Sequence, residues 1–268
     1  MGPSSHAHLA LAVVMTGLMT AMGDASLPDF PAAFEVDLLI PHNTTYAPSP
    51  LMPIVFGVQN PILSKSLQAV IRWDLWEGNN QRSPGSIGGG HLDVDIDVYS
   101  EPQPSNDPLL VSASVNTVAY PDGVWTLAWS LEYTNCSQYT TRSETFYTVF
   151  TVSKSGQAPD LEAATSADVC GSAQALAFNF TSWSQVGCGM PGPSPTTNPC
   201  AATIDSAAAA SLSAFARETG YVCSSNSNLT CPTSFPASGS PRVAAAPTLL
   251  ALLAALAALI PPEMSVHA

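Results

Sequence analysis

The chain has 268 residues, of which 46% are hydrophobic and 10% are charged, against about a quarter charged in an average soluble domain. Its 7 Lys and Arg residues and 20 Asp and Glu residues give a formal net charge of -13, so the composition excludes a basic surface for nucleic acid or anionic lipid. Once the two apolar ends are set aside, about 210 residues remain, which suits one domain and excludes a large multidomain enzyme.

Residues 1–25 have the layout of a secretory signal peptide. A polar start is followed by an apolar stretch at residues 9–22 and by small residues at Gly23 and Ala25, and the apolar stretch is too short to span a bilayer. We expect cleavage near Ala25. The start of the chain lacks the Lys or Arg that is usual in such signals. An uncleaved membrane anchor is the alternative, against which the short apolar stretch argues.

Residues 26–232 form the predicted ectodomain, and its first part is rich in strands. Segments with β-branched and aromatic residues alternate with turn sequences such as 78–90 and 101–108, and no long helical pattern lies between them. This spacing predicts an antiparallel β-sandwich, immunoglobulin-like or similar. The predicted strands are 34–40, 53–59, 70–76, 92–99, 109–119, 124–133, 145–153 and 175–183.

The region 184–232 has a different character and is predicted to be an appendage of the sandwich. A Pro- and Gly-rich loop at 187–200 precedes an Ala-rich segment at 203–219, which we expect to form one amphipathic helix stapled by disulfides. Its apolar residues at helical spacing are Ile204, Ala208, Leu212 and Phe215.

The six cysteines all lie in the second half of the chain. An even number in an exported protein predicts three disulfides. Short loops favour pairing Cys188 with Cys200 and Cys223 with Cys231, which leaves Cys136 with Cys170, although six cysteines allow about 15 connectivities. A zinc site is the alternative, but the chain has no CxxC spacing and no nearby His. The predicted disulfide residues are Cys136, Cys170, Cys188, Cys200, Cys223 and Cys231.

The C-terminus has the layout of a GPI-attachment signal. Residues 233–247 form a linker with small residues around Ser238, the predicted attachment site, and residues 248–268 carry the hydrophobic signal that would be removed. A transmembrane helix over the apolar run 244–260 is the competing interpretation. Together with the leader, this end predicts a secreted protein on the extracellular face of the plasma membrane or in the cell wall.

Four Asn-x-Ser/Thr motifs agree with export, because N-linked glycans need exposed positions in an exported chain. The predicted glycosylation sites are Asn43, Asn135, Asn179 and Asn228.

Histidine chemistry is limited, because only His42 and His91 would remain in the mature ectodomain. His91 opens an alternating acidic stripe that is a weak candidate for a cation site. A straight strand spaces such side chains about 6.6 to 7 Å apart at Cα, so a solvated outer face explains the stripe more simply, and we expect no metal and no cofactor. The members of the stripe are His91, Asp93, Asp95, Asp97 and Tyr99.

Two other patterns bear on carbohydrate chemistry. Paired carboxylates could hydrolyse glycosides, and the candidate pairs all have ordinary solvent-facing explanations: Glu35 with Asp37, Asp74 with Glu77, and Glu132 with Glu144. Among the aromatic residues, Trp125 and Trp129 alternate with leucines and are expected in the core. Trp76, beside Glu77 and a polar loop, is the candidate exposed platform of a ligand face.

The segment FEVDLLIPHNTTYAPSPLMPIVFGVQNP, residues 34–61, resembles the opening of a family of secreted, often GPI-anchored proteins of filamentous fungi that is catalogued as a domain of unknown function. NPCAATIDSAAAASLSA, residues 198–214, is similar to that family's cysteine and Ala-rich helix. The resemblance covers about residues 30–231 and implies a compartment, but it brings no catalytic residues.

Compartment and composition together favour a non-catalytic, glycosylated cell-surface protein with a structural or carbohydrate-contacting role at the fungal wall. Its expected partners are a cell-wall polysaccharide and, through a GPI anchor, the membrane. Two alternatives remain open: a carbohydrate-active hydrolase that uses paired Asp and Glu, and a secreted interaction protein that acts on a host or neighbour.

Overall fold

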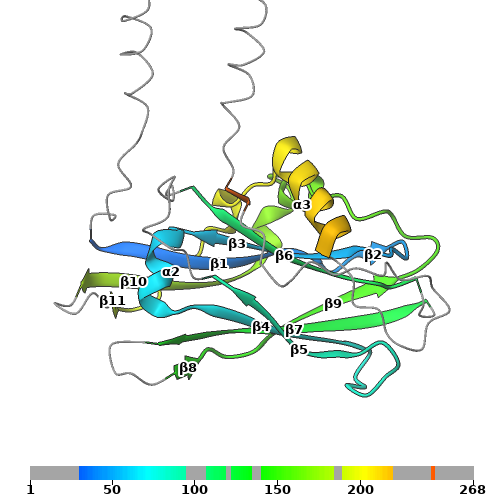
Figure 1. Cartoon of the computed structure of the whole chain (residues 1–268), viewed down its shortest axis with the longest axis horizontal. Coiled ribbons are helices and arrows are strands. Elements are labelled where there is room, and N and C mark those ends of the chain that lie inside the picture. The colour runs from blue at the N-terminus through cyan, green and yellow to red at the C-terminus, as the bar shows by residue number, and fades with distance from the viewer. Residues whose placement is uncertain are drawn as a thin grey trace, which may run out of the picture.

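The computed structural model describes residues 30–94, 107–118, 122–134, 140–183, 189–219 and 243–244. Within these ranges the chain forms two six-stranded sheets, which lie one above the other in Figure 1. Sheet A has the strand order β11 (Gly189–Pro191), β10 (Gln174–Trp183), β1 (Ala32–Ile40), β3 (Met52–Gln59), β6 (Leu109–Val115) and β12 (Val243–Ala244). Sheet B has the order β2 (Thr45–Tyr46), β9 (Phe146–Val152), β7 (Gly123–Thr134), β4 (Val70–Glu77) and β5 (Ile87–Asp93), with β8 (Thr140–Arg142) beside β7.

The prediction of a mainly β fold with antiparallel sheets is confirmed. The described strand pairs are antiparallel, apart from the short parallel pair of β2 with β9. Each predicted strand has a counterpart, since β-branched and aromatic residues suit a pleated, half-buried surface. The short strands β2, β8, β11 and β12 were not predicted, because two or three residues carry no periodic pattern.

One hydrophobic core lies between the sheets. Alternation along β7 places Trp125 and Trp129 on its inner face, where both are almost fully buried, as predicted. Trp129 contacts Phe56 of sheet A edge-on, with ring centroids 5.3 Å apart, and Tyr133 contacts Phe178 at 4.7 Å. Such aromatic pairs contribute about 0.5–1.5 kcal/mol each beyond the area they bury, so they hold the two sheets in register.

Strand β5 begins at Ile87, earlier than predicted, within the glycine-rich segment 78–90 for which the sequence predicts a loop. Gly90 pairs with Trp73 across the strands, and a Cβ on Gly90 would lie 2.3 Å from the Trp73 indole ring. The indole therefore covers the place where a side chain would stand, and an aromatic neighbour stabilises glycine in a strand. His91 and Asp93 are exposed while Leu92 and Val94 are buried, as the predicted alternation requires.

The described helices are short except for α3. They are η1 (Pro61–Leu63), α2 (Ser64–Leu67), η2 (Ala163–Thr165), η3 (Cys170–Ser172), η4 (Pro199–Ala201) and α3 (Ser206–Thr219). Helix α3 confirms the predicted Ala-rich helix. It starts three residues later than expected because the Asp205 carboxylate accepts a hydrogen bond from the Ala208 N–H at 2.8 Å, which caps the helix at Asp205.

The predicted disulfide pairing is wrong for two cysteines. Cys170 is bonded to Cys200, with their Cα atoms 4.9 Å apart, whereas loop lengths had favoured Cys136 for Cys170 and Cys188 for Cys200. The preference for short loops fails because η3 and η4 both lie on sheet A and meet there. The other predicted disulfide residues, Cys136, Cys188, Cys223 and Cys231, lie outside the described residues.

Among the residues that the structure describes, no helix combines the length and the apolar character needed to cross a bilayer. The predicted leader, Ser238 and the C-terminal apolar run all fall outside those residues.

Candidate functional site

The two sheets differ in what lies on their outer faces. Figure 1 shows α3 on the side of sheet A that faces away from sheet B, and no described helix lies over the outer face of sheet B. Residues 158–172 and 198–219, here called the cover, pack on sheet A with Ala202, Ile204, Ala208 and Leu212 in the same hydrophobic cluster as the sheets. The part of sheet A beneath the cover is therefore buried on both faces.

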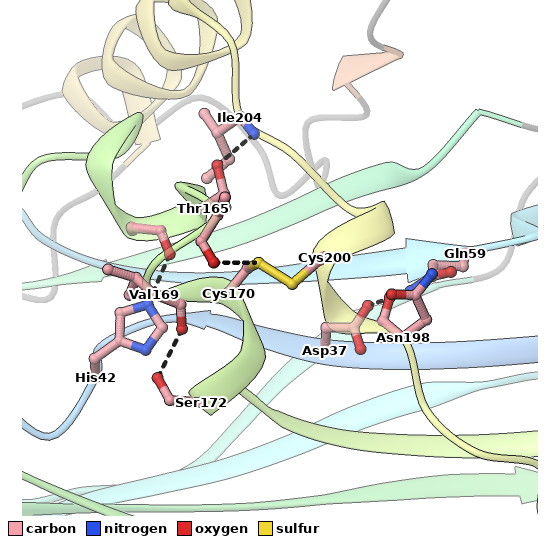
Figure 2. The surroundings of a disulfide bond; sticks show 12 residues. Asp37, His42, Gln59, Thr165, Val169, Cys170, Ser172, Asn198, Cys200 and Ile204 are labelled. Carbon is pink, nitrogen blue, oxygen red and sulfur yellow. Dashed lines mark hydrogen bonds between the residues drawn. A yellow bond between two sulfur atoms is a disulfide. The ribbon is translucent and has the colours of Figure 1, made fainter.

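Three contacts fix the cover to itself and to sheet A. The Cys170–Cys200 disulfide joins η3 to η4, and the Ile204 N–H donates a hydrogen bond to Thr165 Oγ1 at 2.9 Å (Figure 2). Ala202 lies directly against Gly57 of β3, because a Cβ on Gly57 would be 2.6 Å from that of Ala202. Glycine at position 57 thus gives the cover its close approach to the sheet.

Two acidic side chains of β1 lie beneath this cover. Glu35 and Asp37 occupy alternate positions and so share the outer face of sheet A, with relative exposures of 4% and 0%. Glu35 Oε1 accepts a hydrogen bond from the Asn198 N–H at 2.6 Å. The Gln59 side-chain amide donates to Asp37 Oδ2 at 2.9 Å and to the Asn198 carbonyl at 2.8 Å. Figure 2 shows Asp37, Gln59 and Asn198 gathered beside the disulfide.

The environment of this pair favours a proton on Asp37. No described Lys, Arg or His forms an ion pair with either carboxyl group, and Asp37 Oδ1 is buried without a donor facing it. Burial is the largest cause that raises the pKa of Asp37, to about 8, and the hydrogen bond and charge of Glu35 raise it further while Gln59 lowers it. Desolvation and a like charge both disfavour the ionised form of a carboxyl group.

The expectation that the candidate carboxylate pairs face solvent is therefore wrong for Glu35 and Asp37. A local alternating pattern predicts an open face, but the covering residues come from a segment more than 160 positions later. Neither residue lines one of the described hollows, and both carboxyl groups are buried beneath the cover.

The other two candidate pairs do not form facing carboxylates. Asp74 is exposed on the outer face of sheet B and accepts a hydrogen bond from the Gly89 N–H at 2.7 Å, whereas Glu77 points to the opposite side of β4. Glu132 lies between two arginines, and Glu144 is exposed in the turn before β9. Their geometry matches the solvent-facing interpretation.

The outer face of sheet B carries an exposed aromatic and aliphatic surface. Tyr147 and Val149 of β9 and Val124 of β7 are 57%, 42% and 46% exposed. The cross-strand register places Tyr147 beside Ala128, and Val149 beside Thr126, which pairs in turn with Trp76 of β4. We call this surface the Tyr147 face. Its exposed members are Val124, Tyr147 and Val149, which stand over the buried Trp76, Thr126 and Ala128.

The prediction that Trp76 is an exposed platform is wrong. Trp76 does lie on the outer face, but only 7% of it is exposed, because Tyr147 packs edge-on against its ring with centroids 6.4 Å apart. Glu77, the second residue of the predicted ligand face, stands on the other side of the strand, since neighbours along a strand alternate. Tyr147 is the exposed aromatic residue here. Its alternation with the half-buried Phe146 and the buried Thr148 is the pattern in the sequence that marks this position.

A charged network borders the Tyr147 face. Glu132 accepts hydrogen bonds from Arg72 at 2.6 Å and from Arg142 at 2.7 Å. The hydrogen bond from Arg72 is the largest cause that lowers the pKa of Glu132 below its usual value, and Arg142 adds to it. The face therefore has an apolar centre and a polar rim, an arrangement typical of interaction surfaces.

A small hollow of about 250 Å³ borders the Tyr147 face and is lined by Tyr147, Val149 and Gln174, among others. The two larger described hollows lie elsewhere. A groove of about 790 Å³ runs between α3 and the outer faces of β3 and β6, and no aromatic side chain lines it. A second hollow of about 710 Å³ surrounds His42, whose Nε2 is hydrogen-bonded to the Ala164 carbonyl at 2.9 Å. Ser172 also lines this second hollow, and its hydroxyl donates to the Val169 carbonyl at 2.7 Å, so the described hydrogen bonds of His42 Nε2 and Ser172 both go to backbone carbonyls.

The remaining predicted site residues fall in two groups. Within the described ranges no three His, Cys, Asp or Glu side chains converge as metal ligands; His91 and Asp93 stand on β5, and Asp95 and Asp97 lie outside those ranges. Of the glycosylation motifs, Asn43 is exposed between β1 and β2, and Asn179 is half-buried on β10. Asn135 and Asn228 are outside the described residues.

Comparison with known proteins places the chain in a family. Residues 29–232 match the model of the domain of unknown function DUF7136. No curated protein and no solved structure matches the chain. Because the matched region covers most of its length, the protein belongs to the DUF7136 family, which confirms the resemblance to a family of unknown function.

Proposed function

We propose that this protein is a non-catalytic surface module that contacts neutral cell-wall polysaccharide through the Tyr147 face. The observation that carries the proposal is the exposed Tyr147 ring, held against Trp76 on the one sheet face that no described helix covers. Tyrosine offers an apolar ring and a polar hydroxyl at low entropic cost, which suits a sugar that has both apolar and polar faces.

The shape and charge of the surface favour an extended, uncharged polymer. The Tyr147 face is a sheet surface and lines no large hollow, so it suits a chain that lies across the strands better than a small molecule that needs enclosure. The net charge of -13 disfavours a polyanion. Arg72 and Arg142 both pair with the single Glu132 carboxylate, so this network carries one net positive charge rather than two.

The location of the protein is part of the proposal. A secretory leader, attachment at Ser238 and glycans at the four motifs would place the domain outside the cell beside the wall, where fungal family members are expected. Asn43 is exposed enough to accept a glycan. Treatment of intact cells with phospholipase C should release the native protein, and retention on the membrane would contradict a GPI anchor.

Polysaccharide depletion tests the proposed function. The purified full ectodomain is mixed with insoluble chitin, β-glucan, cellulose or fungal wall, and both the protein left in solution and the sugar released are measured. We expect depletion without sugar release. Tyr147→Ala should weaken binding about tenfold, since loss of about 1.4 kcal/mol corresponds to that factor, whereas Tyr147→Phe keeps the ring and should bind nearly as well.

Met190→Ala is the matched control, because Met190 is also exposed but lies on β11 of sheet A. Equal binding by wild type and Tyr147→Ala would contradict the proposed face. Sugar release that persists through purification would contradict the non-catalytic role. If the protein is neither depleted nor releases sugar, polysaccharide binding is contradicted and a protein partner becomes the alternative.

A further inference from the structure

The buried carboxyl pair of β1 takes no part in the proposed binding surface. Glu35 and Asp37 lie on the opposite side of the molecule from Tyr147, beneath residues 198–202. Buried charge is costly unless it is paired with an opposite charge. Among the described residues, the polar neighbours of the two acids are each other, Gln59 and the backbone of Asn198.

The hydrogen bonds of the pair converge on one peptide unit of the cover. The Asn198 N–H donates to Glu35, and the Asn198 carbonyl accepts from Gln59, which also donates to Asp37. The same short segment continues into the disulfide at Cys200. The ionisation state of the two acids is therefore coupled directly to how the cover is held.

A single proton resolves the unfavourable electrostatics of this arrangement. With both carboxyls ionised, two negative charges would lie side by side in a buried site and Asp37 Oδ1 would face no donor. With one proton, Asp37 becomes a donor to Glu35, which removes a charge and supplies the missing hydrogen bond. Glu35 is the one titratable group that faces Asp37 among the described residues: β3 contributes Gln59, β10 contributes Ala175 and Ala177 in register, and η4 contributes the disulfide.

We propose that Asp37 keeps a proton beside Glu35 and that the pair forms a pH-sensitive latch, which fastens residues 198–202 to sheet A in acid and weakens when that proton is lost. The latch makes the folded domain more stable in acidic than in alkaline surroundings. It leaves the Tyr147 face unchanged, so it stands independently of the proposed polysaccharide binding.

The sign of the pH dependence follows from proton linkage. Asp37 holds its proton up to about pH 8 when folded, whereas an unfolded aspartate ionises near its model value of 3.8. Between these limits the folded state binds more protons than the unfolded state, so stability is highest in acid and falls as pH rises. One linked proton increases the unfolding equilibrium constant by at most about tenfold per pH unit.

Urea denaturation of the full ectodomain from pH 5 to pH 9 tests the latch. Asp37→Asn keeps the shape and neutral charge of the protonated acid, so it should remove the Asp37 contribution to the pH slope and be more stable than wild type at pH 8. Asp74→Asn is the matched control. Like Asp37, Asp74 is a strand aspartate that accepts a hydrogen bond, here from the Gly89 N–H, but its side chain is exposed. The control should keep the wild-type slope.

Parallel pH profiles for wild type and Asp37→Asn would overturn the proposal. If Asp37→Asn fails to fold, hydrogen exchange of the Asn198 amide in the wild type tests the latch instead. That N–H donates to Glu35, so its exchange reports how firmly residues 198–202 are held. The protection factor of this amide should fall between pH 6 and pH 9. A constant protection factor over that range would overturn the latch.

Discussion

Replacing Gly57 by alanine tests whether the cover packs directly on sheet A. The added methyl group would lie 2.6 Å from Ala202 Cβ and 3.2 Å from Leu39 Cδ1, whereas carbon atoms in good contact are about 3.5–4.0 Å apart. Overpacking of this kind costs about 1–3 kcal/mol. Part of that cost is offset, since alanine in a strand is favoured over glycine by about 0.5–1 kcal/mol, so a net loss of about 0–2.5 kcal/mol, centred near 1 kcal/mol, is expected.

A compensating substitution isolates the contact. Ala202→Gly alone removes a fully buried methyl group and should cost about 1–2 kcal/mol from lost burial and added backbone freedom. In the double variant, the methyl group added at position 57 takes the space that the methyl group removed from position 202 had filled. We therefore expect the two losses to be non-additive, with a coupling of about 1–2 kcal/mol in favour of the double variant.

Urea denaturation of the four proteins gives this coupling directly. Gly88→Ala serves as control, because a Cβ on Gly88 would meet only Asp74 Oδ1 at an ordinary 3.5 Å, and its stability should stay within about 0.5 kcal/mol of wild type. Losses at Gly57 and Ala202 that add within about 0.5 kcal/mol would refute direct packing of the cover on β3.

Two further predictions concern the disulfide and the charged rim. Replacing Cys170 and Cys200 by alanine should lower the free energy of unfolding by about 3–4 kcal/mol, since the bond closes a loop with a sequence separation of 30; non-reduced peptide mapping that links Cys200 to another cysteine would contradict the pairing. Glu132→Gln should cost about 0.5–1 kcal/mol at neutral pH, as for a partly exposed ion pair with Arg72 and Arg142. Because the pKa of Glu132 is lowered in the folded state, the extra stability of the wild type over Glu132→Gln should shrink as the pH falls and Glu132 becomes protonated. A stability difference that persists below about pH 2 would contradict the ion pairs as its cause.

Strand positions could be predicted from the sequence wherever one face is buried and the other is open. Trp125, Trp129 and the leucines between them alternate with small and polar residues, and this pattern alone placed β7 and its inner face. Strand β5 shows the limit of the method. Its glycines carry no side-chain pattern, and the Trp73 ring that stabilises them belongs to another strand.

The buried carboxyl pair could not be located by alternation, because alternation reports which residues share a face and not what later covers that face. The run Leu38, Leu39 and Ile40 is the local hint, since three consecutive apolar residues indicate a strand that is buried on both sides. Its cover comes from residues 198–202, and the hydrogen bond from Asn198 to Glu35 joins positions 163 apart in the sequence.

The sequence could not show that Trp76, the residue predicted to be an exposed platform, is covered by another strand. Trp76 stands on the outer face of β4 beside a polar loop, which favours exposure, but Tyr147 arrives from β9 and takes the exposed position. Such cross-strand covering depends on the register of sheet B. Neither strand's own sequence specifies that register.

A titration followed by amide chemical shifts tests the central claim most directly. Soluble hexasaccharides of β-glucan and of chitin would be added to the isotopically labelled ectodomain. Binding at the Tyr147 face predicts that the perturbed amides cluster on β7 and β9 around Thr126, Ala128 and Tyr147, and that Tyr147→Ala abolishes the perturbation. Shifts confined to the groove between α3 and sheet A, or no shifts with either sugar, would contradict the account.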